Sequence, residues 1–171
     1  MAWGDTIRVT DLYSREYLGK VSMVTDNPQQ AIDGVDVILL CLPGYALEST
    51  LLSIKPYLQK RQIVGSIVSS TGFFFIAHEI LGSEVKLFGF QRTPFIARLS
   101  EYGHSANLLG YKKDLKMAVE NICNLGEFCR IIENLFLTPI TLLNNFKTNK
   151  YDHSFVLDTT DLSVDDTVNI I

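Results

Sequence analysis

The sequence predicts an α/β fold, a parallel β-sheet flanked by helices, because short apolar runs alternate with segments of helical pattern. Three runs are rich in branched residues and almost free of charge: Val35–Leu42, Ile63–Ser69 and Val85–Phe90. Such runs are typical of strands that are buried on both faces. Their starts lie about 20 to 30 residues apart, as in βαβ units. Cys41, inside the first run, is expected to be a buried thiol in a strand.

The segments before and between these strands are predicted to be short helices, over residues 27–34, 45–58 and 73–82. Asn27 followed by Pro28 is a helix start, because the Asn side chain caps free backbone N–H groups and proline suits the first helical position. Pro56 should end or bend the second helix near Ile54. The third helix is apolar, and Gly82 suits its C-terminal cap.

Short β-like runs are also expected outside this alternation. Near the N-terminus they are Thr6–Val9 and Lys20–Thr25, separated by the polar, turn-prone stretch Asp11–Lys20. Later in the chain, Ser105–Tyr111 predicts a strand of a short β-hairpin, with His104 exposed in its turn.

A C-terminal helical stretch is predicted from Lys112 to Pro139. Apolar residues between Leu115 and Phe136 fall at helical spacing, and they indicate one amphipathic helix, or two separated near Gly126. Two helices cost less than a single helix that carries an internal glycine.

Composition excludes several classes of protein. The net charge of −4 leaves no basic footprint, which argues against a nucleic-acid binder. The three cysteines, Cys41, Cys123 and Cys129, form no CxxC pair, so they indicate neither a zinc site nor a disulfide framework. No apolar stretch approaches the length of a membrane span and the N-terminus has no signal-peptide pattern, so a cytoplasmic protein is expected.

The segments that follow the three strands are the candidate ligand-binding loops. In an open parallel sheet, ligands bind beyond the carboxyl ends of the strands. Here those segments are Cys41–Tyr45, Ser69–Gly72 and Gln91–Pro94, which combine small or hydroxyl residues with Gly or Pro. Such loops let a ligand approach the backbone and offer it hydrogen-bond donors. The alternative is that they are ordinary turns.

One expected element is absent from the sequence. A Rossmann fold holds the pyrophosphate of its dinucleotide on a Gly-x-Gly-x-x-Gly loop at a helix N-terminus. That spacing occurs nowhere in the chain. We therefore expect a partial Rossmann-like parallel sheet, which carries the nicotinamide side of the fold without the phosphate-anchoring side.

Two motifs carry a resemblance to a known family. Gly34–Pro43 (Gly-Val-Asp-Val-Ile-Leu-Leu-Cys-Leu-Pro) is common to many Rossmann dehydrogenases. Gln91–Arg98 (Gln-Arg-Thr-Pro-Phe-Ile-Ala-Arg), continued by Tyr102-Gly103 and Leu109–Lys112, is far more specific. It resembles the Leu/Thr-Pro-Trp/Phe-x-x-Arg, Tyr-Gly and Leu-Gly-x-Lys pattern of the opine dehydrogenase family, the octopine and nopaline dehydrogenase group related to ketopantoate reductases.

The resemblance implies an oxidoreductase that uses NAD or NADP to join an amino acid reductively to a 2-oxo acid. Hydride adds to the imine that the two substrates form. The cofactor would lie along residues of the first two loops, three at the nicotinamide-ribose edge and three near the nicotinamide: Leu42, Pro43 and Tyr45, then Ser69, Ser70 and Thr71. Thr93 and Arg98 would approach the substrate, where a guanidinium pairs well with a carboxylate. The alternative for Arg98 is a surface or interdomain salt bridge.

The domain organisation follows from the same resemblance. Residues 1–146 are predicted to form a partial NAD(P)-binding Rossmann-like domain, and residues 147–171 a divergent acidic tail. A solvated tail is favoured over a calcium site, because the alternating ligand pattern with a central glycine is absent. No catalytic residue is assigned to this chain, since the family's catalytic histidine belongs to a second domain. Neither His78, on an apolar helix, nor His153 is favoured as a general base.

We expect the chain alone to be inactive, as a truncated fragment of such an oxidoreductase. A noncatalytic Rossmann remnant that acts as an interaction module is the alternative, with a homodimer formed through an exposed sheet edge. A fragment of a ketopantoate reductase-like enzyme is a further alternative. The choice between NAD and NADP stays open, because the discriminating residue follows the second strand of a complete domain.

Overall fold

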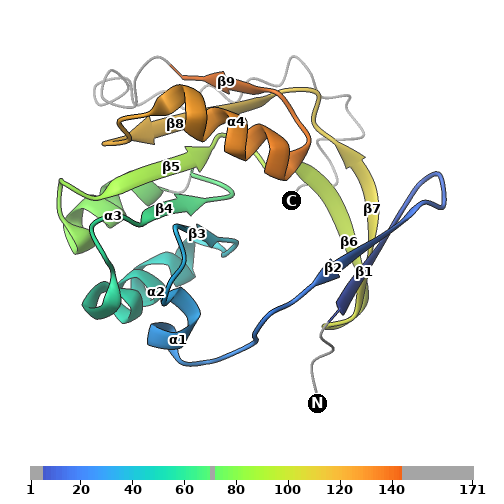
Figure 1. Ribbon diagram of the computed structural model, residues 1–171, viewed down its shortest axis with the longest axis horizontal. Helices are drawn as coiled ribbons and strands as arrows, with labels where there is room; N and C mark the ends of the chain where they lie inside the picture. The colour runs from blue at the N-terminus through green and yellow to red at the C-terminus, as the bar shows by residue number, and fades with distance from the viewer. Residues whose placement is uncertain (1–5, 70–71, 144–171) are drawn as a thin grey trace.

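The computed structural model describes residues 6–69 and 72–143, in which the strands form two sheets (Figure 1). The larger sheet consists, in spatial order, of β3 (Val37–Leu40), β4 (Ile63–Ser66), β5 (Lys86–Phe90), β8 (Leu115–Glu120) and β9 (Ile140–Leu142). β3, β4 and β5 are parallel, β8 is antiparallel to β5, and β9 is parallel to β8. The predicted parallel sheet is confirmed, and two further strands extend it.

The smaller sheet joins two hairpins. Its spatial order is β2 (Glu16–Lys20), β1 (Thr6–Asp11), β7 (Ser105–Tyr111) and β6 (Phe95–Glu101). Each hairpin is antiparallel, and β1 pairs with β7 in parallel. The predicted hairpin around 105–111 is confirmed, with β6 as its other strand.

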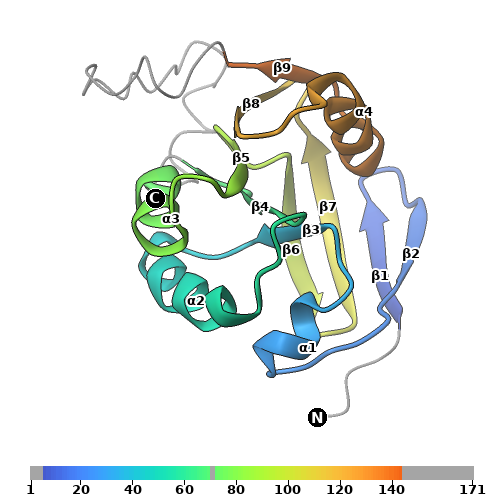
Figure 2. The same cartoon turned by 60° about the vertical axis from the view of Figure 1, so that its left-hand side comes forward.

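Helices cover both faces of the larger sheet, as predicted (Figure 2). α1 (Pro28–Ile32), α2 (Leu47–Ile54) and α3 (Phe73–Leu81) share one apolar cluster, and α4 (Leu125–Phe136) belongs to the other. β3 contributes Ile38 and Leu40 to the first cluster, and Val37 and Leu39 pack against the second. Among the described residues, no helix is long and apolar enough to cross a membrane.

The helix boundaries follow the capping signals in the sequence. The Asn27 side chain accepts hydrogen bonds from the backbone N–H groups of Gln29 and Gln30, which α1 would otherwise leave unpaired. α2 ends at Ile54, and a short 3₁₀ turn containing Pro56 follows it. α3 ends at Leu81 and is capped by Gly82, whose φ of +96° lies in a region that L side chains rarely adopt.

The helix predicted to begin after Lys112 is wrong in its first half, where the chain forms β8. Apolar residues there fit helical spacing, but Leu115 and Met117 also alternate with the exposed Lys116. Pairing with β5 decides between the two patterns, because it buries both side chains beneath α4 and satisfies the backbone. Only α4 remains of the helical stretch, and Gly126 lies in its first turn.

The second N-terminal strand was predicted too far along the chain. β2 ends at Lys20, whereas the predicted run began there. The turn is tight because the Asp11 carboxylate accepts the backbone N–H groups of Tyr13 and Arg15, at 2.8 and 2.9 Å, and the Arg15 side chain at 2.7 Å. These contacts confine the turn to residues 12–15 and bring the chain back into pairing at Glu16.

The turn of the second hairpin also differs from expectation. His104 lies in that turn as predicted, but it is half-buried rather than exposed. Its carbonyl oxygen accepts the backbone N–H of Arg8 at 2.8 Å, which ties the turn to β1. The residue is therefore part of the junction between the two hairpins.

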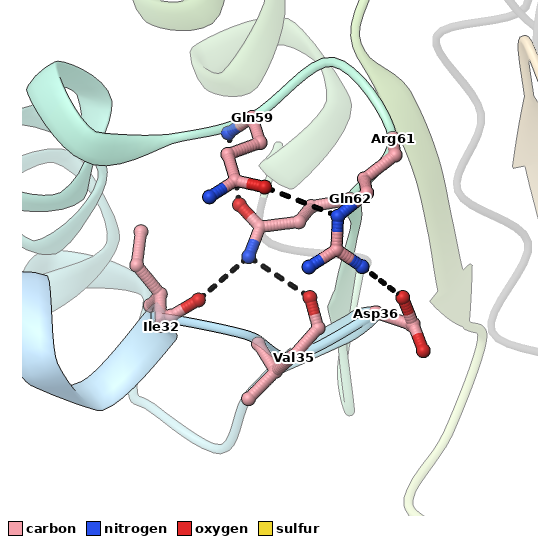
Figure 3. Close-up of polar contacts among 6 residues, drawn as sticks. All are labelled: Ile32, Val35, Asp36, Gln59, Arg61 and Gln62. Carbon is pink, nitrogen blue, oxygen red and sulfur yellow. Dashed lines mark hydrogen bonds and ion pairs between the residues drawn. The ribbon is translucent and has the colours of Figure 1, made fainter.

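A buried glutamine fixes the amino ends of β3 and β4 (Figure 3). Gln62 is 1% exposed, and its Nε2 donates to the carbonyl oxygens of Ile32 and Val35 at 2.6 and 2.9 Å. Its Oε1 accepts the backbone N–H of Gln59 at 2.9 Å. Beside it, the Arg61 side chain pairs with Asp36. This amide links two loops that are about 30 residues apart in the chain.

Candidate functional site

The loops that follow β3, β4 and β5 emerge at one edge of the larger sheet. Leu40 lies beside Ser66, and Ser66 beside Gly89, so the carboxyl ends of the three strands are level. Backbone hydrogen bonds continue past the strand ends, from Ile67 N–H to the Leu40 oxygen at 3.1 Å and from Ser69 N–H to the Phe90 oxygen at 2.9 Å. We call this the carboxyl edge: residues 41–46, 67–69 and 91–94.

The first loop of the carboxyl edge is open to solvent. Leu42 is 37% exposed and Tyr45 is 90% exposed, and Pro43 is exposed as well. A 3₁₀ turn over Gly44–Ala46 carries the chain into α2. These three predicted cofactor residues therefore present apolar and aromatic surface at the edge of the sheet.

Cys41 corrects a prediction. It is exposed just beyond the end of β3, whereas a buried thiol in the strand was expected, because the strand ends one residue earlier than the apolar run. Desolvation by the surrounding chain nevertheless raises the pKa of the Cys41 thiol above its usual value. The side chain reaches solvent while part of its environment is protein, so it is a usable reporter of what binds at this edge.

Ser69 is buried against β5 rather than turned toward solvent. Its hydroxyl donates to the Phe90 carbonyl oxygen at 2.9 Å, the same oxygen that its backbone N–H contacts. Gly89 permits this approach, because a Cβ there would lie 2.5 Å from the Ser69 Cβ. Ser69 therefore holds the second loop in place. The other two residues predicted near the nicotinamide, Ser70 and Thr71, lie outside the described residues.

The two predicted substrate residues lie in different parts of the fold. Thr93 is exposed at the carboxyl edge, directly between β5 and β6. Arg98 is exposed within β6 of the smaller sheet, beside Asn107 of β7, and its Nη1 donates to the neighbouring Ala97 oxygen at 3.3 Å. Leu42, Pro43, Tyr45, Ser69 and Thr93 thus gather at the edge of the larger sheet, whereas Arg98 belongs to the smaller one.

The carboxyl edge also holds a cation, Arg92, which was not among the predicted site residues. Arg92 follows Gln91, whose backbone N–H still pairs with the Lys116 oxygen at 2.9 Å, so the arginine emerges where β5 leaves the sheet. It is half-buried. Its position in the sequence, between a buried strand and Thr93, could have identified it as a candidate binding residue. A guanidinium there suits a carboxylate or a phosphate.

The carboxyl edge lacks the side chains that most often act as general acids and bases. Residues 41–46, 67–69 and 91–94 contain no Asp, Glu or His. The described residues also hold no cluster of His, Cys, Asp or Glu suited to a metal ion. His78 pairs through Nε2 with Glu120, which lies beside Leu87 at the other end of β5. His153 and the predicted tail, 147–171, lie outside the described residues.

The strand order, the helices on both faces and the position of these loops define a Rossmann-like α/β protein. The chain is related to the opine dehydrogenases over a partial region. It is 32% identical to octopine dehydrogenase of Mizuhopecten yessoensis over 103 residues, which are 58% of this chain and 26% of that protein. It is 29% identical to opine dehydrogenase of Haliotis discus hannai over 105 residues, 60% of this chain and 26% of the relative. No family model matches.

Solved structures show the same fold. A structure of octopine dehydrogenase with NADH and L-arginine has a TM-score of 0.75 at 24% identity, over 84% of this chain and 38% of that one. A ketopantoate reductase from Ralstonia eutropha has a TM-score of 0.60 at 17% identity, over 82% of this chain and 44% of that one. The chain thus spans about a quarter of the length of the curated relatives it matches.

Proposed function

We propose that the chain provides the nicotinamide side of an NAD(P)-binding site in an opine dehydrogenase-like oxidoreductase, which joins an amino acid reductively to a 2-oxo acid. The common carboxyl edge of β3, β4 and β5 carries this proposal, because dinucleotides bind at that edge in doubly wound folds. Support comes from the related octopine dehydrogenase, whose structures contain NADH with L-arginine or with pyruvate. The cofactor is NAD or NADP.

Each part of the edge has a proposed task. Leu42 and Pro43 give an apolar surface for the nicotinamide ribose, with Tyr45 beside them, and Ser69 keeps the second loop close to β5. Thr93 and Arg92 offer a hydroxyl and a guanidinium to a substrate carboxylate. Because these loops hold no Asp, Glu or His, their task is to bind and orient the reactants, and the proton is transferred by a group outside them.

The isolated chain is expected to bind NADH or NADPH more weakly than the micromolar range and to have no opine dehydrogenase activity. The sequence has no Gly-x-Gly-x-x-Gly loop, so the interactions that anchor the pyrophosphate are missing. Titration of the purified chain with each dinucleotide, followed by nucleotide fluorescence, measures the affinity. A dissociation constant in the micromolar range would contradict this expectation.

Millimolar NADH is expected to slow alkylation of Cys41 by iodoacetamide and to leave Cys123 unaffected. Cys41 is exposed at the carboxyl edge, whereas Cys123 follows β8, whose last residue lies beside Leu87 at the opposite end of β5. Mass spectrometry of the modified peptides gives both rates in one sample. Equal alkylation rates for Cys41 with and without NADH would show that the dinucleotide does not bind at the carboxyl edge.

The second candidate function is a noncatalytic interaction module that forms a homodimer. The specific observation that favours it is β3, an edge strand whose two faces are apolar. Size-exclusion chromatography with light scattering separates the two functions. A dimer that persists on dilution supports the module, whereas a monomer whose Cys41 is protected by NADH supports the dinucleotide site.

A further inference from the structure

β2 forms the outer edge of the smaller sheet (Figure 2). All five of its residues are exposed, and within residues 6–69 and 72–143 no strand pairs with its free side. Charged side chains on an edge strand normally discourage pairing with another chain. β2 carries two of them, Glu16 and Lys20, but they have opposite signs and stand at its two ends. Whether these charges repel or attract a partner strand therefore depends on what that strand places opposite them.

The hydrogen bonds of β1 show which backbone groups of β2 face outward. The Arg8 N–H donates to the His104 oxygen at 2.8 Å, so Arg8 turns its backbone groups toward β7 and away from β2. Leu18 stands opposite Arg8, and the two therefore form a non-hydrogen-bonded pair. The Leu18 N–H and C=O consequently point to the free side of β2. The hairpin turn agrees with this alternation, because the Asp11 N–H donates to the Arg15 oxygen, three residues before Leu18, at 3.0 Å.

The free side of β2 is thus a short row of three residues, Glu16, Leu18 and Lys20, each with an outward N–H and C=O. Tyr17 and Gly19, which lie between them, direct their backbone groups to β1 instead. An antiparallel partner forms hydrogen bonds with this row only if its own outward residues stand opposite these three. For a second copy of β2, this requirement leaves a few registers, which differ by steps of two residues.

One of these registers gives every residue of β2 a complementary neighbour. When Leu18 stands opposite Leu18 of the second copy, Glu16 stands opposite Lys20, and twofold symmetry repeats that ion pair on the other side. In the same register Tyr17 stands opposite Gly19. The ring has room there, because among the described residues a Cβ on Gly19 would have only the Ile7 oxygen within 4 Å, at 3.9 Å. A shift of two residues in either direction loses both ion pairs.

We propose that β2 is a self-association site, at which two copies of this chain pair antiparallel through residues 16–20 and join their smaller sheets into one continuous sheet. The charges of β2 support a second copy as the occupant. Within the hairpin Glu16 faces Thr10 and Lys20 faces Thr6, so the hairpin itself does not explain their opposite signs.

The dimer is weak, because each protomer contributes one short strand, and it separates on dilution. It uses neither β3 nor the carboxyl edge, which belong to the larger sheet. The self-association is therefore independent of the proposed dinucleotide site, and protection of Cys41 by NADH does not depend on it.

The test is a charge reversal, read by sedimentation velocity of the full chain. The parent chain is expected to be a monomer at about 1 μM and mostly a dimer at about 500 μM, with a dissociation constant of about 100 μM. Glu16→Lys and Lys20→Glu each place like charges opposite one another at both ion pairs, so each is expected to weaken self-association at least about tenfold. An equimolar mixture of the two variants restores both pairs and is expected to recover the affinity of the parent chain. Glu48→Lys and Lys60→Glu, which make the same changes at exposed residues outside the smaller sheet, are the matched controls and should associate as the parent does.

Hydrogen exchange of the parent chain, read amide by amide by NMR, identifies the strand that pairs. The Glu16, Leu18 and Lys20 amides are expected to exchange about threefold more slowly at about 500 μM than at about 20 μM, because exchange then proceeds through a smaller fraction of monomer. The Tyr17 and Gly19 amides already face β1 and are expected to change little. Should a charge variant not fold, the same alternation in the parent chain still tests the proposal.

Three results would overturn the proposal: a parent chain that stays monomeric at about 500 μM, a dimer that both charge reversals leave unchanged, or two folded variants whose mixture associates no better than either alone. Slower exchange at Val37 and Leu39 in place of Glu16 and Leu18 would assign the dimer to β3, which also overturns it. None of these results bears on the proposed function, since NADH binding is measured at the carboxyl edge.

Discussion

Gly65→Ala is expected to destabilise the domain by about 3 kcal/mol, because the ring of Phe88 lies against the position of the new methyl group. A Cβ on Gly65 would lie 2.0 Å from Phe88 Cε1. Movement of the ring is restricted, since Phe90 and Phe128 pack edge-on against it at centroid distances of 5.8 and 5.2 Å. Phe88 is itself fully buried. Urea unfolding of both proteins measures the difference in free energy.

Two further variants make this expectation specific. Gly126→Ala also adds one methyl group, but Gly126 lies in α4 with open space around it. The free energy of unfolding is therefore expected to stay the same or to rise by up to about 1 kcal/mol. Phe88→Leu in the Gly65→Ala protein should recover part of the lost stability, because the smaller side chain relieves the overlap. If the two glycine variants had equal stability, the close packing of Gly65 on Phe88 would be disproved.

Local signals in the sequence were sufficient for the helix ends and the parallel strands. Asn27-Pro28, Pro56 and Gly82 each act on neighbouring backbone, and the structure uses all three where the sequence places them. β8 could not be found in this way. Leu115 and Met117 fit either period, and the strand exists because β5 offers a partner about 30 residues earlier in the chain.

The candidate site also has features that the local sequence predicts and features that depend on contacts between distant residues. Parallel strands bring their carboxyl ends together whatever the loops contain, so the positions of Leu42, Pro43 and Thr93 followed from the strand pattern. The orientation of a single side chain did not follow. Ser69 looks like a free hydroxyl in the sequence, but Gly89 opens a space into which it folds against the Phe90 oxygen. Such a contact between loops is set by packing rather than by local pattern.

Gln62→Glu is expected to destabilise the chain by about 3 kcal/mol near neutral pH, through the loss of two hydrogen bonds and the burial of a charge. The Gln62 Nε2 donates to the Ile32 and Val35 oxygens, and a carboxylate at the same place has no proton to donate (Figure 3). Gln59→Ala is the matched control. Its side chain contacts the exposed Arg61, and its backbone N–H still meets the residue at 62, so a change within about 0.5 kcal/mol is expected.

The pH dependence of the stability of Gln62→Glu shows whether the loss comes from the buried charge or from the changed shape of the side chain. Burial against carbonyl oxygens raises the pKa of the new carboxyl in the folded protein above its value in the unfolded chain. Its protonated form is therefore favoured by folding, and the penalty is greatest above the folded pKa and shrinks as the pH falls through it. Protonation also restores one donor for the Ile32 or Val35 oxygen. Urea unfolding at about pH 7 and about pH 5 should thus show the gap between Gln62→Glu and the parent protein narrowing. A gap that stays constant would mean that the carboxylate has reached solvent, and that the loops at the amino ends of β3 and β4 are held by other contacts.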